Sequence, residues 1–301
     1  MNKGILYGLG AYGLWGILPI YWKLLVGIPP LEILAHRVVW GLLTLLCLLA
    51  YKQRWLWLTQ VRQNRRTLLT FIATAVLLAA NWFVYIWAVN AGFIVEASLG
   101  YFINPLVNVL FGALFLGERL RSWQKVAITL ALSGVLWLTF SYGALPWISL
   151  SLALTFGLYG LLRKTAQLNA LEGLSLEMIL LFLPALAYLV YLLSSGEFAM
   201  GHVPFWQNIL LLLTGLVTAI PLLLFAMTAR RVTLTTLGIL QYLAPTLQFL
   251  IGVFIYNEPF AASRLVGFVL IWLALALYTT EGIRFGRQQA ALTAAPLNSS
   301  P

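Results

Sequence analysis

The sequence predicts an all-α integral membrane protein made of two related halves, and three observations support this fold class. Hydrophobic residues make up 62% of the 301 residues and charged residues 9%, whereas soluble domains average about 45–50% and 25%. Ten apolar runs have a length near the ~20 residues that cross a hydrocarbon core as a helix. In addition, one stretch of the sequence occurs twice, 140 residues apart.

The ten predicted spans follow one another through short connections. Because their apolar runs are continuous and do not alternate with polar residues, a transmembrane β-barrel is excluded. The first span is too long for a signal peptide and no small-residue cleavage site follows it, so we expect it to be retained. The spans are 4–25, 33–51, 67–89, 94–117, 122–141, 145–162, 174–193, 207–229, 233–256 and 262–280.

The positions of the basic residues predict the orientation. With the amino terminus in the cytoplasm, all of the 18 lysines and arginines except Lys23, Arg37 and Arg264 fall on the inner side. The positive-inside rule therefore predicts a multi-pass plasma-membrane protein with both termini in the cytoplasm. It also accounts for the net charge of +10, so we expect no nucleic-acid partner. Residues 286–301 are small and polar, and we expect a disordered cytoplasmic tail.

The duplication divides the chain into two halves. Residues 100–120 read GYFINPLVNVLFGALFLGERL and residues 240–260 read LQYLAPTLQFLIGVFIYNEPF, which aligns Glu118 with Glu258. LE at 31–32 recurs at 171–172, so each copy comprises five helices, over 1–141 and 145–285. Because five is odd, the second copy is expected to cross the membrane inverted, as in transporters that expose a midplane site alternately. We expect the two glutamates to cap helices or bridge loops.

The fourth and ninth predicted spans each carry polar side chains on one face. Tyr101, Asn104 and Asn108 lie at positions i, i+3 and i+7 of the fourth span, and the ninth has Gln241, Ala244 and Gln248 at the same places. Pro105 and Pro245 each lack an N–H and clash with the carbonyl four residues earlier, so both helices should be kinked. Carbonyls freed at this depth persist only where protein or a watery cavity receives them. Alternatively, these polar groups only bond neighbouring helices. The candidate substrate-binding residues here are Tyr101, Asn104, Asn108, Gln241, Tyr242 and Gln248.

The third predicted span supplies a second candidate wall. Asn81, Trp82 and Tyr85 share a face because they are separated by three or four residues. Aromatic surface with a few hydrogen-bonding groups suits an amphipathic organic solute. The alternative for these rings is an interfacial aromatic belt.

Charged residues inside or beside the spans are candidates for gating or coupling. Arg37 should find a partner because an unpaired charge in the membrane centre costs about 2.5–3.5 kcal/mol. That partner is Glu32 or Glu96 in a structural lock, or a substrate carboxylate held by the guanidinium fork. His36 lies four residues after Glu32, and histidine is the side chain whose ordinary charge change falls near neutral pH, so this residue is either a proton-coupling group or a hydrogen-bonded neighbour.

Three blocks of the sequence resemble a known family. LEILAHRVVW at 31–40, NWFVYIWAVNAGFIVEASLGYFINPLVNVLFGALFLGERL at 81–120 and QYLAPTLQFLIGVFIYNEPF at 241–260 are similar to the RarD permeases, or chloramphenicol-sensitivity proteins. These belong to the EamA branch of the drug/metabolite transporter superfamily. The resemblance implies ten helices in two inverted five-helix EamA repeats, a plasma-membrane location and secondary transport, but no particular substrate.

Missing motifs restrict the chemistry. The chain has no G-x-x-x-x-G-K-[ST] phosphate loop, no G-x-S-x-G, no H-E-x-x-H and a single cysteine, Cys47, so we expect neither an enzyme nor a metal or cofactor site. We expect a secondary active or facilitative transporter that exports a small amphipathic metabolite or drug-like solute by alternating access, with protons as a candidate coupling ion. A membrane-embedded lipid flippase, or an enzyme acting on a lipid-like substrate, is the alternative. Both a monomer and a homodimer are compatible with the sequence.

Overall fold

The computed structural model describes residues 3–53, 55–117, 119–142, 144–229, 231–232 and 240–294. Throughout these ranges the regular elements are helices, with no β-strand among them. Eight of the helices are long and apolar enough to cross a membrane, which makes the chain an all-α, multi-pass membrane protein. They are α1 (Lys3–Lys23), α2 (Pro30–Lys52), α4 (Arg65–Ala91), α5 (Ile94–Leu116), α6 (Ser122–Tyr142), α8 (Ala170–Ser195), α9 (Phe205–Ala229) and α12 (Ala262–Ala294).

Two further predicted spans differ from these eight. Helix α7 (Trp147–Thr165) is 19 residues long but carries several hydroxyl side chains, and it does not meet the same criterion of length and hydropathy. The ninth predicted span is described from residue 240 onward, as α11 (Leu243–Leu250) continued by the π-helix η1 (Ile251–Ile255). The predicted count of ten membrane-crossing helices therefore stays a prediction. A short helix, α3 (Trp57–Gln63), lies in the predicted loop after α2.

Local sequence signals set several helix ends. Asn169 and Glu172 form a capping box at the start of α8, in which each side chain accepts a hydrogen bond from the other residue's backbone N–H. Helices α4 and α8 end at Gly92 and Gly196, whose φ angles of 85° and 74° are ones that glycine adopts without a steric penalty.

The carboxyl-terminal segment differs from its prediction. The sequence predicts a disordered tail over 286–301, but α12 remains helical as far as Ala294. This part of the helix reads GRQQAALTA, and alanine, glutamine, leucine and arginine are all good helix formers. Residues 295–301 lie outside the described part of the chain, as does Glu118.

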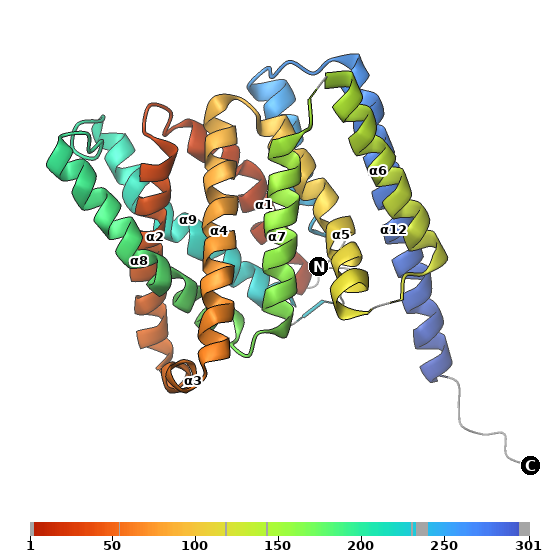
Figure 1. Cartoon of the computed structure of the whole chain (residues 1–301), viewed down its shortest axis with the longest axis horizontal. Coiled ribbons are helices and arrows are strands. Elements are labelled where there is room, and N and C mark those ends of the chain that lie inside the picture. The colour runs from red at the N-terminus through yellow and green to blue at the C-terminus, as the bar shows by residue number, and fades with distance from the viewer. Residues whose placement is uncertain are drawn as a thin grey trace, which may run out of the picture.

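The connections between helices gather at two opposite ends of the bundle (Figure 1). One end carries the connections 24–29, 92–93, 196–204 and 256–261; we call it the Glu258 end, and it is uppermost in Figure 1. The other carries α3, the connection 166–169 and the end of α12. We call this second end the Arg163 end.

The buried apolar side chains form two principal clusters that do not coincide with the halves of the sequence. One cluster comes mainly from α1, α2, α4, α7, α8 and α9, which we call the large group. The other comes mainly from α5, α6 and α12, with side chains of α11 packed against it, and we call these four helices the small group. Each group therefore combines helices from both halves of the chain.

Helices α6 and α12 pack side by side at one edge of the bundle (Figure 1). Trp137 Nε1 donates a hydrogen bond to the Ser263 carbonyl over 2.9 Å, and Arg121 Nη2 bonds Glu281 Oε2 over 2.7 Å. Low residue numbers on one helix thus meet high numbers on the other, so the two helices run antiparallel. Between these contacts, Gly267 leaves no room for a side chain, because an added Cβ would overlap Leu138. Small residues permit this close approach of helices within membranes.

We expect Gly267→Ala to lower the midpoint of thermal unfolding of the purified protein in detergent. The added methyl group overlaps Leu138, and overpacking of this kind typically costs about 1–3 kcal/mol. Gly282→Ala on the same helix is the matched control, because nothing lies within 4 Å of the position of its Cβ. Equal midpoints for the two variants would show that the close approach at Gly267 does not hold α6 and α12 together.

Candidate functional site

A cavity of about 490 Å³ lies between the large and small groups. Volumes of this size are typical of small-molecule sites, which occur preferentially between the helices of bundles. Its wall comes from both halves of the chain and from eight helices, namely α1, α2, α4, α5, α7, α8, α9 and α11.

Most of the predicted substrate-binding residues meet at this cavity. Tyr242 is the exception: it lines a separate, smaller apolar depression with Phe102 and Trp272. Its assignment to the cavity wall is therefore corrected, because Tyr242 follows Gln241 in a turn that directs the two side chains to different surfaces. The residues that line the cavity as predicted are Asn81, Trp82, Tyr85, Tyr101, Asn104, Asn108, Gln241 and Gln248, together with Pro105 and Pro245.

The two prolines act differently on their helices. Helix α5 continues through Pro105 without interruption. Before Pro245, by contrast, residues 241 and 242 form a turn and α11 begins at Leu243. The break lies at the residue whose carbonyl the proline ring would meet, four positions earlier. The second copy is thus interrupted at the cavity, whereas the first copy is a continuous helix there.

Asn81 uses its amide to hold three helices together. Its Nδ2 donates to the Leu152 carbonyl and to Thr155 Oγ1 on α7, each over 3.0 Å, and its Oδ1 accepts from the Tyr101 hydroxyl of α5 over 3.3 Å. Asn81 therefore bonds neighbouring helices, which is the alternative predicted from the sequence for the polar residues of the fourth and ninth spans.

Three other cavity residues keep a polar atom without a partner. Gln248 donates from Nε2 to the Trp15 carbonyl over 3.1 Å, but its Oε1 is unpaired, as are Asn104 Oδ1 and the Tyr85 hydroxyl. Buried polar atoms almost always have a partner, so an unpaired atom at a cavity calls for water or a ligand. These three groups are the best-placed candidates for contacts with a solute.

Arg37 lies on the cavity wall and pairs with neither of the predicted glutamates. Its Nε donates to Thr218 Oγ1 over 2.9 Å, and its guanidinium carbon lies 3.7 Å from the centre of the Trp82 ring. Glu32 is five residues earlier on the same helix, which places it about 140° away around the helix axis. Glu96 lies on α5 in the small group, where its electrostatic partner is Arg264 of α12.

Glu32 and His36 lie together at the Glu258 end, away from the cavity. Glu32 is fully buried and accepts a hydrogen bond from the backbone N–H of Ala199 over 2.9 Å. His36 Nε2 lies 3.9 Å from Glu32 Oε1, and its Nδ1 accepts from Trp40 Nε1 over 3.2 Å. The Tyr21 hydroxyl donates to the Leu210 carbonyl nearby. These contacts join the two halves of the chain at this end.

Glu258 caps a helix, as expected from its position in the repeat. Its two carboxylate oxygens accept hydrogen bonds from the backbone N–H groups of Ile94 and Val95, each over 2.8 Å. A carboxylate at the start of α5 also interacts favourably with the helix dipole. Burial raises the pKa of Glu258, and the two N–H donors oppose that rise. The close approach of η1 to α5 requires Gly252, because a Cβ there would lie 2.9 Å from Val95 Cγ2.

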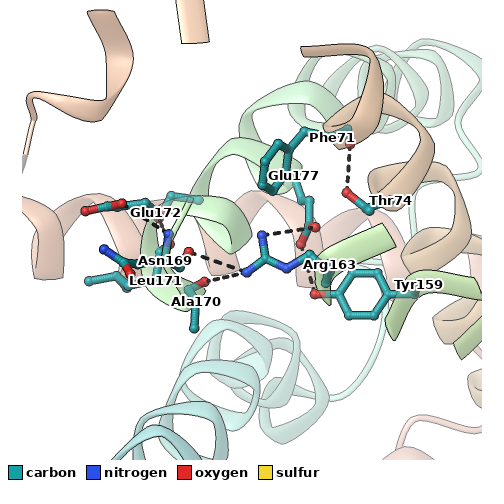
Figure 2. A network of polar contacts seen from close by, with 10 residues as sticks. Phe71, Thr74, Tyr159, Arg163, Asn169, Ala170, Leu171, Glu172 and Glu177 are labelled. Atoms are coloured by element: carbon teal, nitrogen blue, oxygen red, sulfur yellow. Dashed lines mark hydrogen bonds and ion pairs between the residues drawn. The ribbon is translucent and has the colours of Figure 1, made fainter. Parts of the chain in front are cut away.

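A second charged network lies at the Arg163 end of the cavity (Figure 2). Arg163 of α7 lines the cavity, and its Nη1 is 3.9 Å from Oε1 of the fully buried Glu177 on α8. The Tyr159 hydroxyl donates to Glu177 Oε2 over 3.3 Å, and Arg163 Nη2 donates to the carbonyls of Asn169 and Ala170 over 3.4 Å each. This network was not identified from the sequence, although Glu177 lies inside the predicted span 174–193 and a charge in a span indicates a partner within the protein.

Gly173 makes room for this network. An added Cβ at Gly173 would overlap the Arg163 guanidinium, so the arginine reaches Glu177 only because residue 173 has no side chain. We expect Gly173→Ala to displace Arg163 and to lower the midpoint of thermal unfolding, because the buried Glu177 carboxylate loses its cation.

A double-mutant cycle tests this coupling. In the charge-neutral Arg163→Gln/Glu177→Gln background, Gly173→Ala should cost less than in the wild type, by about 0.5–3 kcal/mol. If Gly173→Ala is equally destabilising in both backgrounds, the role of Gly173 does not involve the ion pair.

Comparisons with known proteins agree with the sequence resemblance. A family model described as "EamA-like transporter family" matches residues 2–140. "Protein RarD" from Streptomyces exfoliatus is 47% identical over 291 residues, which cover 96% of this chain and 92% of that protein. "Uncharacterized transporter YojE" from Bacillus subtilis (strain 168) is 44% identical and covers 95% of this chain and 96% of its own.

A solved structure titled "Crystal structure of protein" has a TM-score of 0.56 and covers 91% of this chain and 96% of its own, at 19% identity. At that identity it indicates a shared fold only. The two relatives, by contrast, are similar over almost their whole length. The chain therefore belongs to the EamA-like transporter family, as a permease of the RarD type.

Proposed function

We propose that this chain is a secondary active or facilitative transporter that exports a small amphipathic solute by alternating access. The observation that carries the proposal is the central cavity, whose wall combines aromatic rings with unpaired amide oxygens from both copies of the repeat. Aromatic area binds an apolar body and the amides bind its polar groups. Because the chain belongs to a transporter family, the cavity is proposed to be the path of the solute.

The proposed architecture is ten helices in two inverted five-helix repeats, 1–141 and 145–285. Contacts between the halves support it, because helix pairs that touch have counterparts made of the corresponding helices of the other half. The pair α5 and α7 corresponds to α11 and α1, the pair α2 and α9 to α8 and α4, and the pair α1 and α9 to α7 and α4. The corresponding helices α6 and α12 lie antiparallel through Trp137–Ser263 and Arg121–Glu281. Equivalent helices that run in opposite directions are what an inverted repeat requires.

The moving units of the proposed mechanism are the large and small groups. Hydrogen bonds that join the two halves occur mostly inside one group: Glu32–Ala199 in the large group, and Glu258–Ile94 in the small group. Rocking the halves of the sequence against each other would break these bonds, whereas rocking the groups keeps them. The bonds that cross between groups include Gln248–Trp15 and Tyr101–Asn81, which border the cavity.

The proposed orientation places the Arg163 end and both termini in the cytoplasm of a cell whose plasma membrane contains the protein. Its support is the distribution of lysines and arginines along the sequence. Protons are the proposed coupling ion, and His36 is the candidate carrier because its buried Nε2 has no hydrogen-bond partner and lies next to Glu32. Glu32 and His36 then act at the outer end of the path, distant from the solute site.

We expect Asn104→Ala and Gln248→Ala each to reduce solute flux about 2- to 10-fold, because each removes one solute hydrogen bond worth about 0.5–1.5 kcal/mol. The measurement is counterflow in proteoliposomes with a panel of labelled neutral, anionic and cationic metabolites. Tyr242→Phe is the control, because this hydroxyl lies outside the cavity, and it should leave flux unchanged.

Other outcomes would contradict the proposal. Unchanged flux in both amide variants would mean that the solute path runs elsewhere. Absence of protein-dependent flux for the whole panel, together with lipid scrambling or lipid-ester hydrolysis, would favour the flippase or enzyme alternative.

A further inference from the structure

We propose that the transported solute carries one negative charge, as a carboxylate, and that Arg37 is its binding partner; this rests on the proposed function. The charged side chains that line the cavity are Arg37 and Arg163, and no carboxylate lies among the described lining residues. Arg163 is balanced by Glu177 at 3.9 Å. Arg37 is thus the charge for which the cavity wall offers no counter-ion.

The other described residues of the chain do not supply one either. The sequence contains no aspartate and eight glutamates, of which all but Glu118 fall in the described residues. None of these seven lies within ion-pair distance of Arg37. Glu32 bonds Ala199, and Glu258 caps α5. A cation this deeply buried in a membrane protein is costly unless water or an anion reaches it.

A comparison of the two copies of the repeat shows that the charge without a counter-ion is specific to the first half. At the offset of 140 that aligns LE at 31–32 with LE at 171–172, Arg37 aligns with Glu177. The second half thus also carries a charged residue, Glu177, at this position of its second helix, α8. Glu177 has Arg163 of α7 as its partner. In the first half the charge faces the cavity and has the Trp82 ring and Thr218 as neighbours.

The contacts of Arg37 orient its guanidinium for recognition. Trp82 stacks on one side at 3.7 Å, and Nε donates to Thr218, whose own hydroxyl is held by the Thr214 carbonyl over 2.9 Å. Stacking and a fixed Nε hold the guanidinium plane, and the terminal nitrogens form a fork that matches the two oxygens of a carboxylate. A phosphate monoester with about two charges would exceed the single positive charge available.

The other residues that line the cavity indicate the chemistry of the rest of the solute. Trp15, Phe156 and Phe225 provide apolar surface, and Asn104 Oδ1 and Gln248 Oε1 are unpaired acceptors. The solute class is therefore a small amphipathic monocarboxylate with an aromatic or aliphatic body and at least one N–H or O–H donor.

Ligand binding to the purified full chain in detergent tests this inference. The probes are aromatic carboxylates paired with their primary amides: hippurate with hippuramide, and indole-3-acetate with indole-3-acetamide. We expect a carboxylate to raise the midpoint of thermal unfolding and its amide to have no effect at the same concentration. Arg37→Gln should weaken carboxylate binding about 10- to 100-fold, the range expected for a lost charge-assisted bond. Arg37→Lys should recover part of it.

The control is Arg163→Gln/Glu177→Gln, which removes a balanced pair and leaves the net charge of the cavity unchanged. This variant should still prefer carboxylates over amides. The inference is overturned if amides stabilise the wild type as well as carboxylates do, if no carboxylate stabilises it, or if Arg37→Gln binds carboxylates normally. If the counterflow panel then shows transport of neutral or cationic solutes only, the transporter proposal stands and the assignment of charge fails. If no solute moves, the proposed function itself fails.

A second measurement needs no ligand. Thr218→Glu places a carboxylate next to Arg37, so it should raise the unfolding midpoint in the wild type and lower it in Arg37→Gln, where the new charge has no partner. If Thr218→Glu lowers the midpoint equally in both backgrounds, Arg37 already has a counter-ion and the inference is wrong.

Discussion

The structure depends on one constraint: inside a membrane, a polar or charged group must find its partner within the protein. Several glutamates of this chain meet the constraint by contacts with other helices or connections. Glu258 accepts two N–H bonds at the start of α5, more than 160 residues away in sequence. Glu32 likewise accepts the Ala199 N–H, and Glu177 faces Arg163. Some of the groups that lack a partner border the cavity, namely Arg37, which has no counter-ion, and the amide oxygens of Asn104 and Gln248. Others, such as Trp22 Nε1 and His36 Nε2, lie away from it.

Much of the site could be predicted from the sequence because helical periodicity decides which residues share a face. Tyr101, Asn104 and Asn108 meet at the cavity for that reason, and so do Asn81, Trp82 and Tyr85. Partners from other helices could not be predicted, because they depend on how helices rotate and pack. The residues concerned here are Arg37, which lies across its helix from Glu32, and Glu177, which meets an arginine from α7.

The fold shows a similar division between predictable and unpredictable features. Apolar runs of about 20 residues predicted the long helices, because the hydrocarbon core fixes that length. Pro105 and Pro245, however, led to the same expectation and gave different results, since α5 is continuous and α11 begins only after a turn. A proline weakens a helix at a known place, but the neighbouring helices decide whether it bends or breaks.

This difference between the two copies bears on the proposed alternating access. In a protein with an inverted repeat, exchanging the conformations of the two copies converts a site open to one side into a site open to the other. Here the second copy is interrupted at Gln241, and after this break η1 packs closely on α5 at Gly252 and the Glu258 carboxylate caps α5. The first copy is continuously helical through the matching residue, Tyr101. In the proposed alternating access, the opposite state would therefore have α5 broken near Tyr101 and α11 continuous through Gln241, while the Glu258 cap on α5, which lies within the small group, is retained.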